Sequence, residues 1–344
     1  MSQPLRRRLV GPLQSRIGSR LVLEPIVERA YRRYLGTDRT SGLGYAAMRK
    51  LFGSARPQAF DALADRSTRE RPRLDLGAAS GVLAGEVADA AAALRRDGVV
   101  LLRSRLPEAE CAALEAVAVA ADCDVVARFR PGPDRARFDA GAPEAVRYDV
   151  PEAVLLQDEM VQTLLGDESV LAVAQEYLGG APVHDLVAMW WTAPSTAESS
   201  AAAQQFHFDL DRLRFVKLFV YLTDVGPANG PHHYVKGSHR DLPRQLRADR
   251  RFTDAEVLGH YGADALVEIT GPRGSMFLAD TRGLHKGLNV VEGHRLVFQL
   301  ECSTSLFGKP LDRPSVPVAA PALRAAIASH PGAYRRLLAE DPRR

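Results

Sequence analysis

The second half of the chain consists of short apolar runs separated by turn residues, and this pattern restricts the fold more than any other feature. After about residue 180, runs rich in Val, Phe, Tyr and Trp alternate with Gly, Pro, Asn and Asp. Runs of this length and spacing are typical of strands in a sandwich or barrel. The strands that the pattern predicts are 185–192, 204–210, 215–223, 274–278 and 295–303. We therefore expect a mainly β core.

The chain before this core is predicted to be largely helical. Residues 1–80 read as short helices joined by loops rich in Gly, Pro and Arg, which we interpret as an N-terminal helical extension. An Ala-rich stretch over 83–96 predicts a further helix, and a turn then leads into a short buried strand at 99–102. A helix that begins at Pro107 should reach about residue 121.

Composition and charge argue against several classes of protein. The 344 residues are 46% hydrophobic and 25% charged, as in ordinary globular proteins. A net charge of +3 is too small to indicate a nucleic-acid partner. Neither a signal peptide nor an apolar run long enough to span a membrane is recognisable. The three cysteines form no CxxC pair, which indicates free thiols. We therefore expect a cytoplasmic protein.

The first part of the chain is basic. Its arginines are Arg6, Arg7, Arg8, Arg16, Arg20, Arg29, Arg32 and Arg33. They indicate either a surface that docks an anionic membrane or partner, or a solvated helix face. The solvated face is favoured, because the apolar stripe is short and is interrupted by Gly11 and Gly18.

His207 and Asp209 stand two residues apart on the predicted strand 204–210. Alternate residues of a strand share a face, so the imidazole and the carboxylate project together. With one more His they would form the 2-His-1-carboxylate triad, which binds iron(II) and leaves positions open for a bidentate co-substrate and O2. The third ligand must come from another strand. His285 fits, since the strand at 274–278 leads into the loop that carries it.

The predicted strand 295–303 supplies a cation beside this centre. Its alternation places Leu296, Phe298, Leu300 and Cys302 on one face and Arg295, Val297, Gln299 and Glu301 on the other. An arginine on the second face suits a dicarboxylate, because a guanidinium binds a carboxylate in bidentate fashion.

The predicted strand 215–223 follows the same logic. One face is purely aliphatic, with Val216, Leu218, Val220 and Leu222. The opposite face carries Phe215, Lys217, Phe219 and Tyr221, and we place it toward the cavity. Lys217 and Tyr221 are then candidate donors to the co-substrate, and Phe219 is a candidate wall.

Several segments, taken in order, resemble the phytanoyl-CoA dioxygenase family. They are Asp97-Gly98-Val99-Val100-Leu101-Leu102, His207-Phe208-Asp209, Leu222-Thr223-Asp224-Val225, Asn229-Gly230-Pro231, Gly237-Ser238-His239, His285 and Arg295. The resemblance covers roughly the C-terminal two thirds of the chain. It implies a domain over 81–344 whose core, at about 180–308, is a double-stranded β-helix of jelly-roll or cupin-like type. It also implies iron(II) bound by His207, Asp209 and His285, and Arg295 as the anchor for the distal carboxylate of 2-oxoglutarate.

The chain departs from this family at the second contact to that distal carboxylate. Family members often carry Ser or Thr close to the anchoring Arg or shortly after the distal His, where Val297 and Gly287 stand here. Lys217, Tyr221 and Thr281 are the candidate replacements.

Further side chains are candidates for contact with the substrate. They are Gln205, Trp191, Gln299 and His239. Trp190 and Trp191 must point to opposite faces of one strand, so one packs in the core and the other can line the pocket; Trp191 is our candidate. His239 would brace the loop near the site.

Other titratable residues near these positions receive structural interpretations. Asp280, five residues before His285, is interpreted as a carboxylate that caps its loop. His232, His233 and His239 lie in a turn-rich region without matching partners, which favours loop structure over a second metal site.

Together these features predict an enzyme that hydroxylates an unactivated C–H bond of a small molecule and releases succinate and CO2. Asp209 fills the position that related halogenases leave free, so oxygenation is favoured over halogenation. One alternative is the same oxidising chemistry used for desaturation, epoxidation or cyclisation, and another is a non-catalytic, metal-binding cupin-like module. Neither the substrate (an acyl derivative, an amino-acid derivative or a natural-product intermediate) nor the oligomeric state follows from the sequence. Arg212, Arg214 and Arg240 flank the expected mouth, and a solvated rim is favoured over an anion site.

Overall fold

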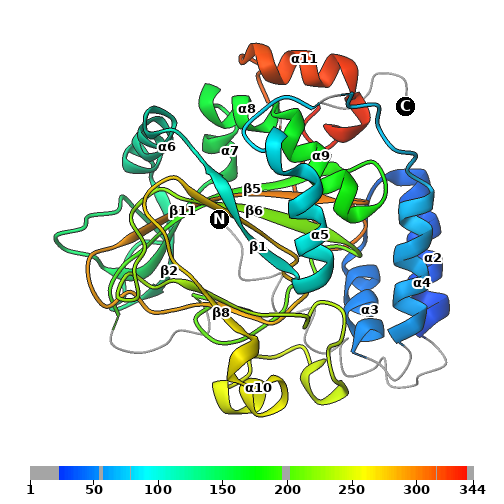
Figure 1. Ribbon diagram of the computed structural model, residues 1–344, viewed down its shortest axis with the longest axis horizontal. Helices are drawn as coiled ribbons and strands as arrows, with labels where there is room; N and C mark the ends of the chain where they lie inside the picture. The colour runs from blue at the N-terminus through cyan, green and yellow to red at the C-terminus, as the bar shows by residue number, and fades with distance from the viewer. Residues whose placement is uncertain (1–22, 54–56, 78, 196–201, 315, 339–344) are drawn as a thin grey trace.

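The strands form two antiparallel sheets in the computed structural model (Figure 1), which describes residues 23–53, 57–77, 79–195, 202–314 and 316–338. The main sheet runs, in spatial order, β1 (Val99–Arg105), β9 (Ser275–Ala279), β6 (Phe215–Tyr221), β11 (Arg295–Ser303), β5 (Val183–Thr192), β4 (Ala145–Val150), β2 (Cys123–Arg128) and β3 (Arg135–Ala136). The smaller sheet is β10 (His285–Gly287), β7 (His232–Val235) and β8 (Leu266–Ile269).

Helices cover the outer face of the main sheet (Figure 1). They are α5 (Val87–Asp97), α6 (Glu108–Ala120), α7 (Glu152–Leu155), α8 (Glu159–Leu165), α9 (Glu168–Leu178) and α11 (Pro321–Ser329). The helix α10 (Asp254–Tyr261) lies beyond β8, and short 3₁₀ turns span Ala84–Glu86, Arg244–Leu246, Ala263–Ala265 and Pro331–Ala333.

The helix-covered face of the main sheet is aliphatic, as the alternation predicts. Leu218 and Val220 of β6 pack there beside Leu296 and Phe298 of β11, all 3% exposed or less. The same cluster contains the cysteines, namely Cys111, Cys123 and Cys302. Burial of these side chains removes apolar surface from water and holds the helical layer against the sheet.

The inner face of the main sheet looks toward the smaller sheet and carries aromatic side chains. Trp190, Phe219, Tyr221 and Phe277 form a buried cluster with Tyr234, whose strand belongs to the smaller sheet. Phe219 stacks on Phe277 with ring centroids 4.7 Å apart. Two facing antiparallel sheets with this interior are the predicted double-stranded β-helix, with helices from the first half of the chain around it.

The turn that leads into β1 depends on glycine. Helix α5 ends at Gly98, which has φ of +81°. A Cβ atom there would lie 2.3 Å from the hydroxyl of Tyr234 and 2.4 Å from Nδ1 of His239. Gly98 O also accepts a hydrogen bond from Asp280 N at 2.8 Å. The close approach of these groups therefore excludes any side chain at this position.

Two features of the β core differ from the prediction. The main sheet begins at β1 and includes β2 to β4, so strands extend well before residue 180. The segment 204–210 is not a continuous strand; it pairs through isolated bridges of Phe206 with Phe252 and of His207 with His285. The backbone groups of these two adjacent residues point to opposite edges, so a different segment pairs on each side and neither forms a regular ladder.

The N-terminal helices pack beside the sheets rather than over the larger one. They are α2 (Leu23–Thr37), α3 (Gly42–Phe52) and α4 (Pro57–Arg69). Their buried side chains share a cluster with Phe206, Phe208 and Leu210. These three helices support the segment around His207, whereas α5, also from the first third of the chain, packs on the larger sheet. The domain boundary at residue 80 stays a prediction.

The basic residues Arg6 to Arg20 lie outside the described residues. Within the described ranges, no helix is both long and apolar enough to cross a membrane.

Candidate metal centre

His207 and His285 face each other across an antiparallel bridge. His207 N donates to His285 O at 3.0 Å, and His285 N donates to His207 O at 2.9 Å. Directly paired residues project from the same face, and the two imidazole centroids are 4.3 Å apart. Asp209 N donates to Thr281 O at 2.7 Å. One potential ligand atom of each of His207, Asp209 and His285 lies within 4.8 Å of the others.

The orientation of both imidazoles leaves Nε2 available to a metal. His207 Nδ1 lies 2.9 Å from Gln205 O, and His285 Nδ1 lies 2.9 Å from Gly283 O. Because a carbonyl only accepts, each Nδ1 carries the proton and each Nε2 keeps its lone pair. The Nε2 atoms lie 3.8 and 3.6 Å from the carboxylate oxygens of Asp209.

Electrostatics keeps the three groups in the protonation states that ligation requires. Burial lowers the pKa of His207 to about 3 and also lowers the pKa of His285, so both rings are neutral at pH 7. Burial raises the pKa of Asp209, but the ammonium of Lys217 outweighs it and holds that pKa well below its ordinary value. Two neutral imidazoles and a carboxylate are the donor set that suits iron(II) with open positions.

Lys217 is engaged by carboxylates rather than directed at an open cavity. Its ammonium donates to Asp209 Oδ2 at 2.7 Å and to Asp211 Oδ2 at 3.3 Å, and it lies 3.4 Å from Glu301 Oε2. Burial lowers the pKa of Lys217, and the three carboxylates raise it by more, so the ammonium stays charged. The expected role of Lys217 as a donor to the co-substrate therefore does not fit the structure.

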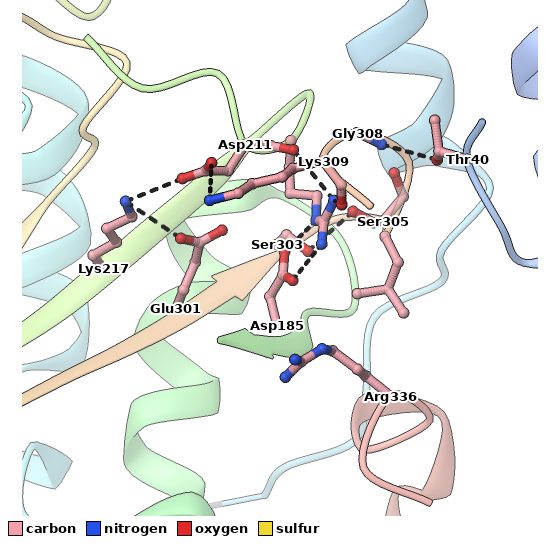
Figure 2. A network of polar contacts seen from close by, with 12 residues as sticks. Thr40, Asp185, Asp211, Lys217, Glu301, Ser303, Ser305, Gly308, Lys309 and Arg336 are labelled. Carbon is pink, nitrogen blue, oxygen red and sulfur yellow. Dashed lines mark hydrogen bonds and ion pairs between the residues drawn. The ribbon is translucent and has the colours of Figure 1, made fainter. Parts of the chain in front are cut away.

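The carboxylates around Lys217 continue into a buried polar network (Figure 2). Asp211 also lies 3.6 Å from the ammonium of Lys309. Farther from the triad, Arg212 Nη2 donates to Asp185 Oδ1 at 2.7 Å, and both side chains are fully buried. This network fixes the segment that follows Asp209, and it accounts for Arg212, which was expected at the mouth of the site.

Arg295 opens β11 on the inner face of the main sheet and is 4% exposed. Its Nη2 donates to Thr192 Oγ1 at 3.3 Å, whereas Nε and Nη1 have no hydrogen-bond partner in the described part of the chain. Burial lowers the pKa of Arg295 to about 10, still above neutral pH. A Cβ atom at Gly287 would lie 3.1 Å from Nη2. A buried, charged guanidinium with free donors fits a carboxylate ligand.

Tyr221 shares the inner face with Arg295, and its hydroxyl is already bonded. It donates to Ile269 O at 2.9 Å and accepts from His232 N at 3.1 Å. His232 Nδ1 also lies 2.9 Å from this hydroxyl. The expected donation of Tyr221 to the co-substrate would require these bonds to rearrange.

The other predicted co-substrate and wall residues lie on the inner face of the main sheet or on the segments that carry the triad. Thr281 is buried, and its hydroxyl has no partner among the described residues. Phe219 contacts His232 with ring centroids 5.4 Å apart. Gln299 is paired directly with Phe219 and faces inward. Gln205 is half-buried and contributes its backbone carbonyl to His207.

The assignment of Trp191 to the pocket is wrong. In the register of β5 and β11, Trp191 is paired with Leu296 and faces the helices, where it stacks on Phe138 at 4.6 Å. Trp190 is the tryptophan on the inner face, paired with Val297. Alternation alone gives two faces, and only the pairing with the strand of Arg295 decides between them.

His239 also lies away from the triad. It lines a surface pocket with Arg95 of α5, Tyr177 of α9, Arg214 and Arg240. Arg214 forms an ion pair with Asp65, and Arg240 Nη2 donates to Arg96 O at 2.8 Å. The expected contact of His239 with the substrate is therefore not supported. Arg282, from the loop before His285, lines the same pocket, which agrees with the expected bracing of that loop by His239. Arg214 and Arg240 are engaged in contacts within the protein.

The loop before His285 is held by a buried ion pair, as the loop-capping interpretation of Asp280 predicts. Arg282 N donates to Asp280 Oδ1 at 3.0 Å, and the guanidinium of Arg282 binds the same carboxylate. Tyr177 donates to Asp280 Oδ2 at 2.6 Å.

Across the described ranges, the triad is the one group of His, Cys, Asp and Glu placed to hold a metal.

Sequence reasoning placed His232 in a loop and did not single out Thr192, but both lie on strands and face the interior between the two sheets. His232 lies on β7 between Tyr221 and Phe277, with ring centroids 5.7 and 5.3 Å away. The alternation of His232 and Tyr234 on a short strand was the available signal. Thr192 is paired with Arg295, a relation that the sequence does not encode without the register.

The sequence and the fold of this chain are similar to those of known proteins. The family model described as phytanoyl-CoA dioxygenase matches residues 94–293. No curated protein matches the sequence. The structure of EctD from S. alaskensis with bound Fe is 22% identical, with a TM-score of 0.48 over 72% of this chain and 89% of that one. HygX from Streptomyces hygroscopicus, with nickel and 2-oxoglutarate bound, is 17% identical, with a TM-score of 0.45 over 64% and 88%. AviO1 from Streptomyces viridochromogenes Tue57 is 19% identical, with a TM-score of 0.44 over 65% and 96%.

Proposed function

Since this chain belongs to the phytanoyl-CoA dioxygenase family and is a 2-oxoglutarate-dependent oxygenase, we propose that His207, Asp209 and His285 hold its iron(II). Arg295 then binds the distal carboxylate of 2-oxoglutarate, and the enzyme hydroxylates an unactivated C–H bond of a small molecule. The observation that carries this proposal is the joint presence of a ligand triad and a buried guanidinium with free donors. Bound iron(II) would couple the oxidative decarboxylation of 2-oxoglutarate by O2 to oxidation of the substrate.

The protein's own groups orient the reactants and exclude water. Lys217 holds one oxygen of Asp209, which leaves the other oxygen for the metal. Thr192 lies at hydrogen-bond distance from Arg295, and Thr281 carries a buried hydroxyl with no partner in the described chain. Each hydroxyl is a candidate for the second contact to the distal carboxylate. Phe219, Phe277 and Trp190 form apolar walls that strengthen the ionic contact by excluding water.

Anaerobic spectroscopy tests the metal and co-substrate sites without turnover. We expect the wild-type protein with iron(II) and 2-oxoglutarate to show the weak visible absorption band of the chelate. Asp209→Ala and His207→Ala should abolish the band, because each removes a ligand. Arg295→Gln should keep the band and raise the 2-oxoglutarate concentration needed for half saturation at least tenfold. A band of wild-type strength and affinity in all three variants contradicts the assignment of these residues. Absence of the band in the wild-type protein favours a cupin-like module without 2-oxoglutarate chemistry.

Mass spectrometry identifies the reaction. A metabolite extract incubated with the enzyme, iron(II), 2-oxoglutarate and O2 should yield a product heavier by one oxygen and stoichiometric succinate. A product lighter by two hydrogens would instead identify desaturation or cyclisation by the same centre. The Asp209→Ala protein, incubated in parallel, should leave the extract unchanged.

A further inference from the structure

The segment around Phe252 lies alongside the segment that carries His207. Phe252 N donates to Phe206 O at 2.9 Å, and the two residues form an antiparallel bridge. Extended by one residue, this register places Arg251 opposite His207. Directly opposed residues of an antiparallel pair project from the same face. Arg251 therefore extends on the side on which His207 presents its imidazole to the triad.

Arg251 differs from the arginines near it in having no partner. Arg250 forms an ion pair with Glu256 at 2.6 Å and lies over the ring of Phe252, and Arg49 is paired with Asp249. The half-buried guanidinium of Arg251 makes neither a hydrogen bond nor an ion pair with any residue that the structure describes. Keeping a partly desolvated cation without a counter-ion is unfavourable unless a ligand supplies one.

The positive charge of Arg251 interacts electrostatically with all three residues of the triad. It contributes, after burial, to lowering the pKa values of His207 and His285. Burial lowers the pKa of Arg251 itself, and the carboxylate of Asp209 opposes that shift. These interactions agree with the register in placing the guanidinium beside the metal centre.

Arg251 and Arg295 interact with different sets of charged and polar groups. The charged and polar groups that act on Arg295 are Tyr221 and Arg147, which lie in the main sheet. Those that act on Arg251 are Asp209, Asp249 and Arg49. A co-substrate anchored at Arg295 therefore leaves Arg251 available to a second anion.

We propose that Arg251 binds a carboxylate or phosphate group of the oxidised substrate, so that the substrates of this enzyme are anionic. The inference rests on the proposed function, because it takes the triad as the place of oxidation. A guanidinium binds either group through two parallel hydrogen bonds. An anion fixed there lies next to His207 and orients the rest of the substrate toward the metal.

Paramagnetic relaxation tests this site without knowledge of the substrate. The protein is loaded with manganese(II) and saturated with 2-oxoglutarate, and inorganic phosphate and ¹³C-labelled acetate serve as separate probes, which distinguishes the two anion classes. In the wild type, at least one probe should show saturable relaxation enhancement by the metal. Arg251→Gln should weaken its binding at least tenfold. Arg250→Gln removes the same charge one residue away and should change the binding less than twofold.

The outcomes separate this inference from the proposed function. Absence of saturable enhancement in the wild type, equal binding in Arg251→Gln, or equal losses in both variants overturns the role of Arg251. Affinity for 2-oxoglutarate, measured by the anaerobic iron(II) band, should stay within twofold in Arg251→Gln; a loss as large as that in Arg295→Gln would assign Arg251 to the co-substrate instead. If manganese(II) fails to bind, as read from its free-ion magnetic resonance signal, the proposed metal site fails. Calorimetric titration of the two anions into the metal-free proteins then decides on Arg251 by the same criteria.

Discussion

Lys217 takes its role from the charges that surround it. The alternation of β6 correctly places it on the inner face, and from that face a donor to 2-oxoglutarate was expected. The structure surrounds its ammonium with Asp209, Asp211 and Glu301 instead. Removal of this ammonium would leave the buried negative charges of Asp209 and Asp211 without their compensating cation.

Lys217→Met should therefore destabilise the fold strongly. We expect the free energy of unfolding to fall by about 3–5 kcal/mol, measured by urea denaturation. Lys309 is the matched control, because it also approaches Asp211, at 3.6 Å, but is half exposed. Lys309→Met should cost less than about 1 kcal/mol. Equal losses in the two variants would contradict the proposed importance of the buried ammonium.

The burial of His184 should make the stability of the fold sensitive to acid, independently of the metal centre. His184 is buried against Tyr334, and burial lowers its pKa to about 4. An unfolded imidazole titrates near pH 6.5, so between about pH 6.5 and 4 the unfolded chain binds a proton that the folded chain does not. Stability from this residue is thus lost as the pH falls, by about 1.4 kcal/mol per pH unit. Unfolding at pH 7 and pH 5 should show a smaller difference in His184→Asn than in the wild type.

At the scale of elements, the loop between β9 and β10 determines where His285 stands. Its buried carboxylate, Asp280, binds Arg282 and accepts a hydrogen bond from Tyr177 of α9. The loop is thereby tied to the helical layer as well as to its own backbone. His285 is presented by this braced loop, so the geometry of the triad depends on contacts outside it.

Asp280→Asn should weaken metal binding without touching a ligand. The change removes the negative charge opposite the buried guanidinium of Arg282 and lets the loop relax. We expect manganese(II) affinity to fall at least tenfold and the free energy of unfolding to fall by about 3 kcal/mol. Tyr177→Phe, which removes one hydrogen bond to the same carboxylate, should cost only about 1 kcal/mol and leave metal affinity nearly unchanged. An unaltered affinity in Asp280→Asn would show that the loop does not set the position of His285.

Strand patterns allowed the faces of β6 and β11 to be predicted, because one face is aliphatic and the other carries polar and aromatic groups. The same reasoning could not choose between Trp190 and Trp191, since both faces of β5 are buried. It also gave a continuous strand at 204–210, where the structure has bridges to two separate segments. Such pairings depend on contacts between residues far apart in the chain. Arg251 escaped notice for this reason, since its position beside His207 follows from the bridge at Phe206.

At the scale of the whole molecule, the helices α2 to α4 form a support beside the metal centre. Phe60 contacts Phe52 at 5.2 Å, and Phe52 contacts Phe208 at 5.3 Å between ring centroids. Phe208 stands between His207 and Asp209 in the sequence. The apolar contacts of the N-terminal helices thus reach the backbone that carries two of the proposed ligands.

Phe60→Ala should affect stability and metal binding together. Phe60 is fully buried, so its truncation should lower the free energy of unfolding by about 3–5 kcal/mol through lost burial and the cavity that remains. Manganese(II) affinity should fall as well, because the support of Phe208 is loosened. Leu35→Ala, on an exposed position of α2, should change neither by a measurable amount. A stability loss with wild-type metal affinity would mean that the helices do not hold the centre.

The main sheet also separates the cysteine thiols from the proposed oxidising centre. All three thiols, Cys111, Cys123 and Cys302, are buried on its helical side, and burial raises their pKa values. The thiolate is the form of cysteine most easily oxidised, and the raised pKa values keep its fraction small. The backbone of the main sheet also lies between these thiols and the metal centre. Oxidising equivalents that escape productive use would reach the aromatic rings of the inner face first. We therefore expect oxidative damage to begin at aromatic side chains such as Trp190 and Tyr221, while the three thiols stay reduced.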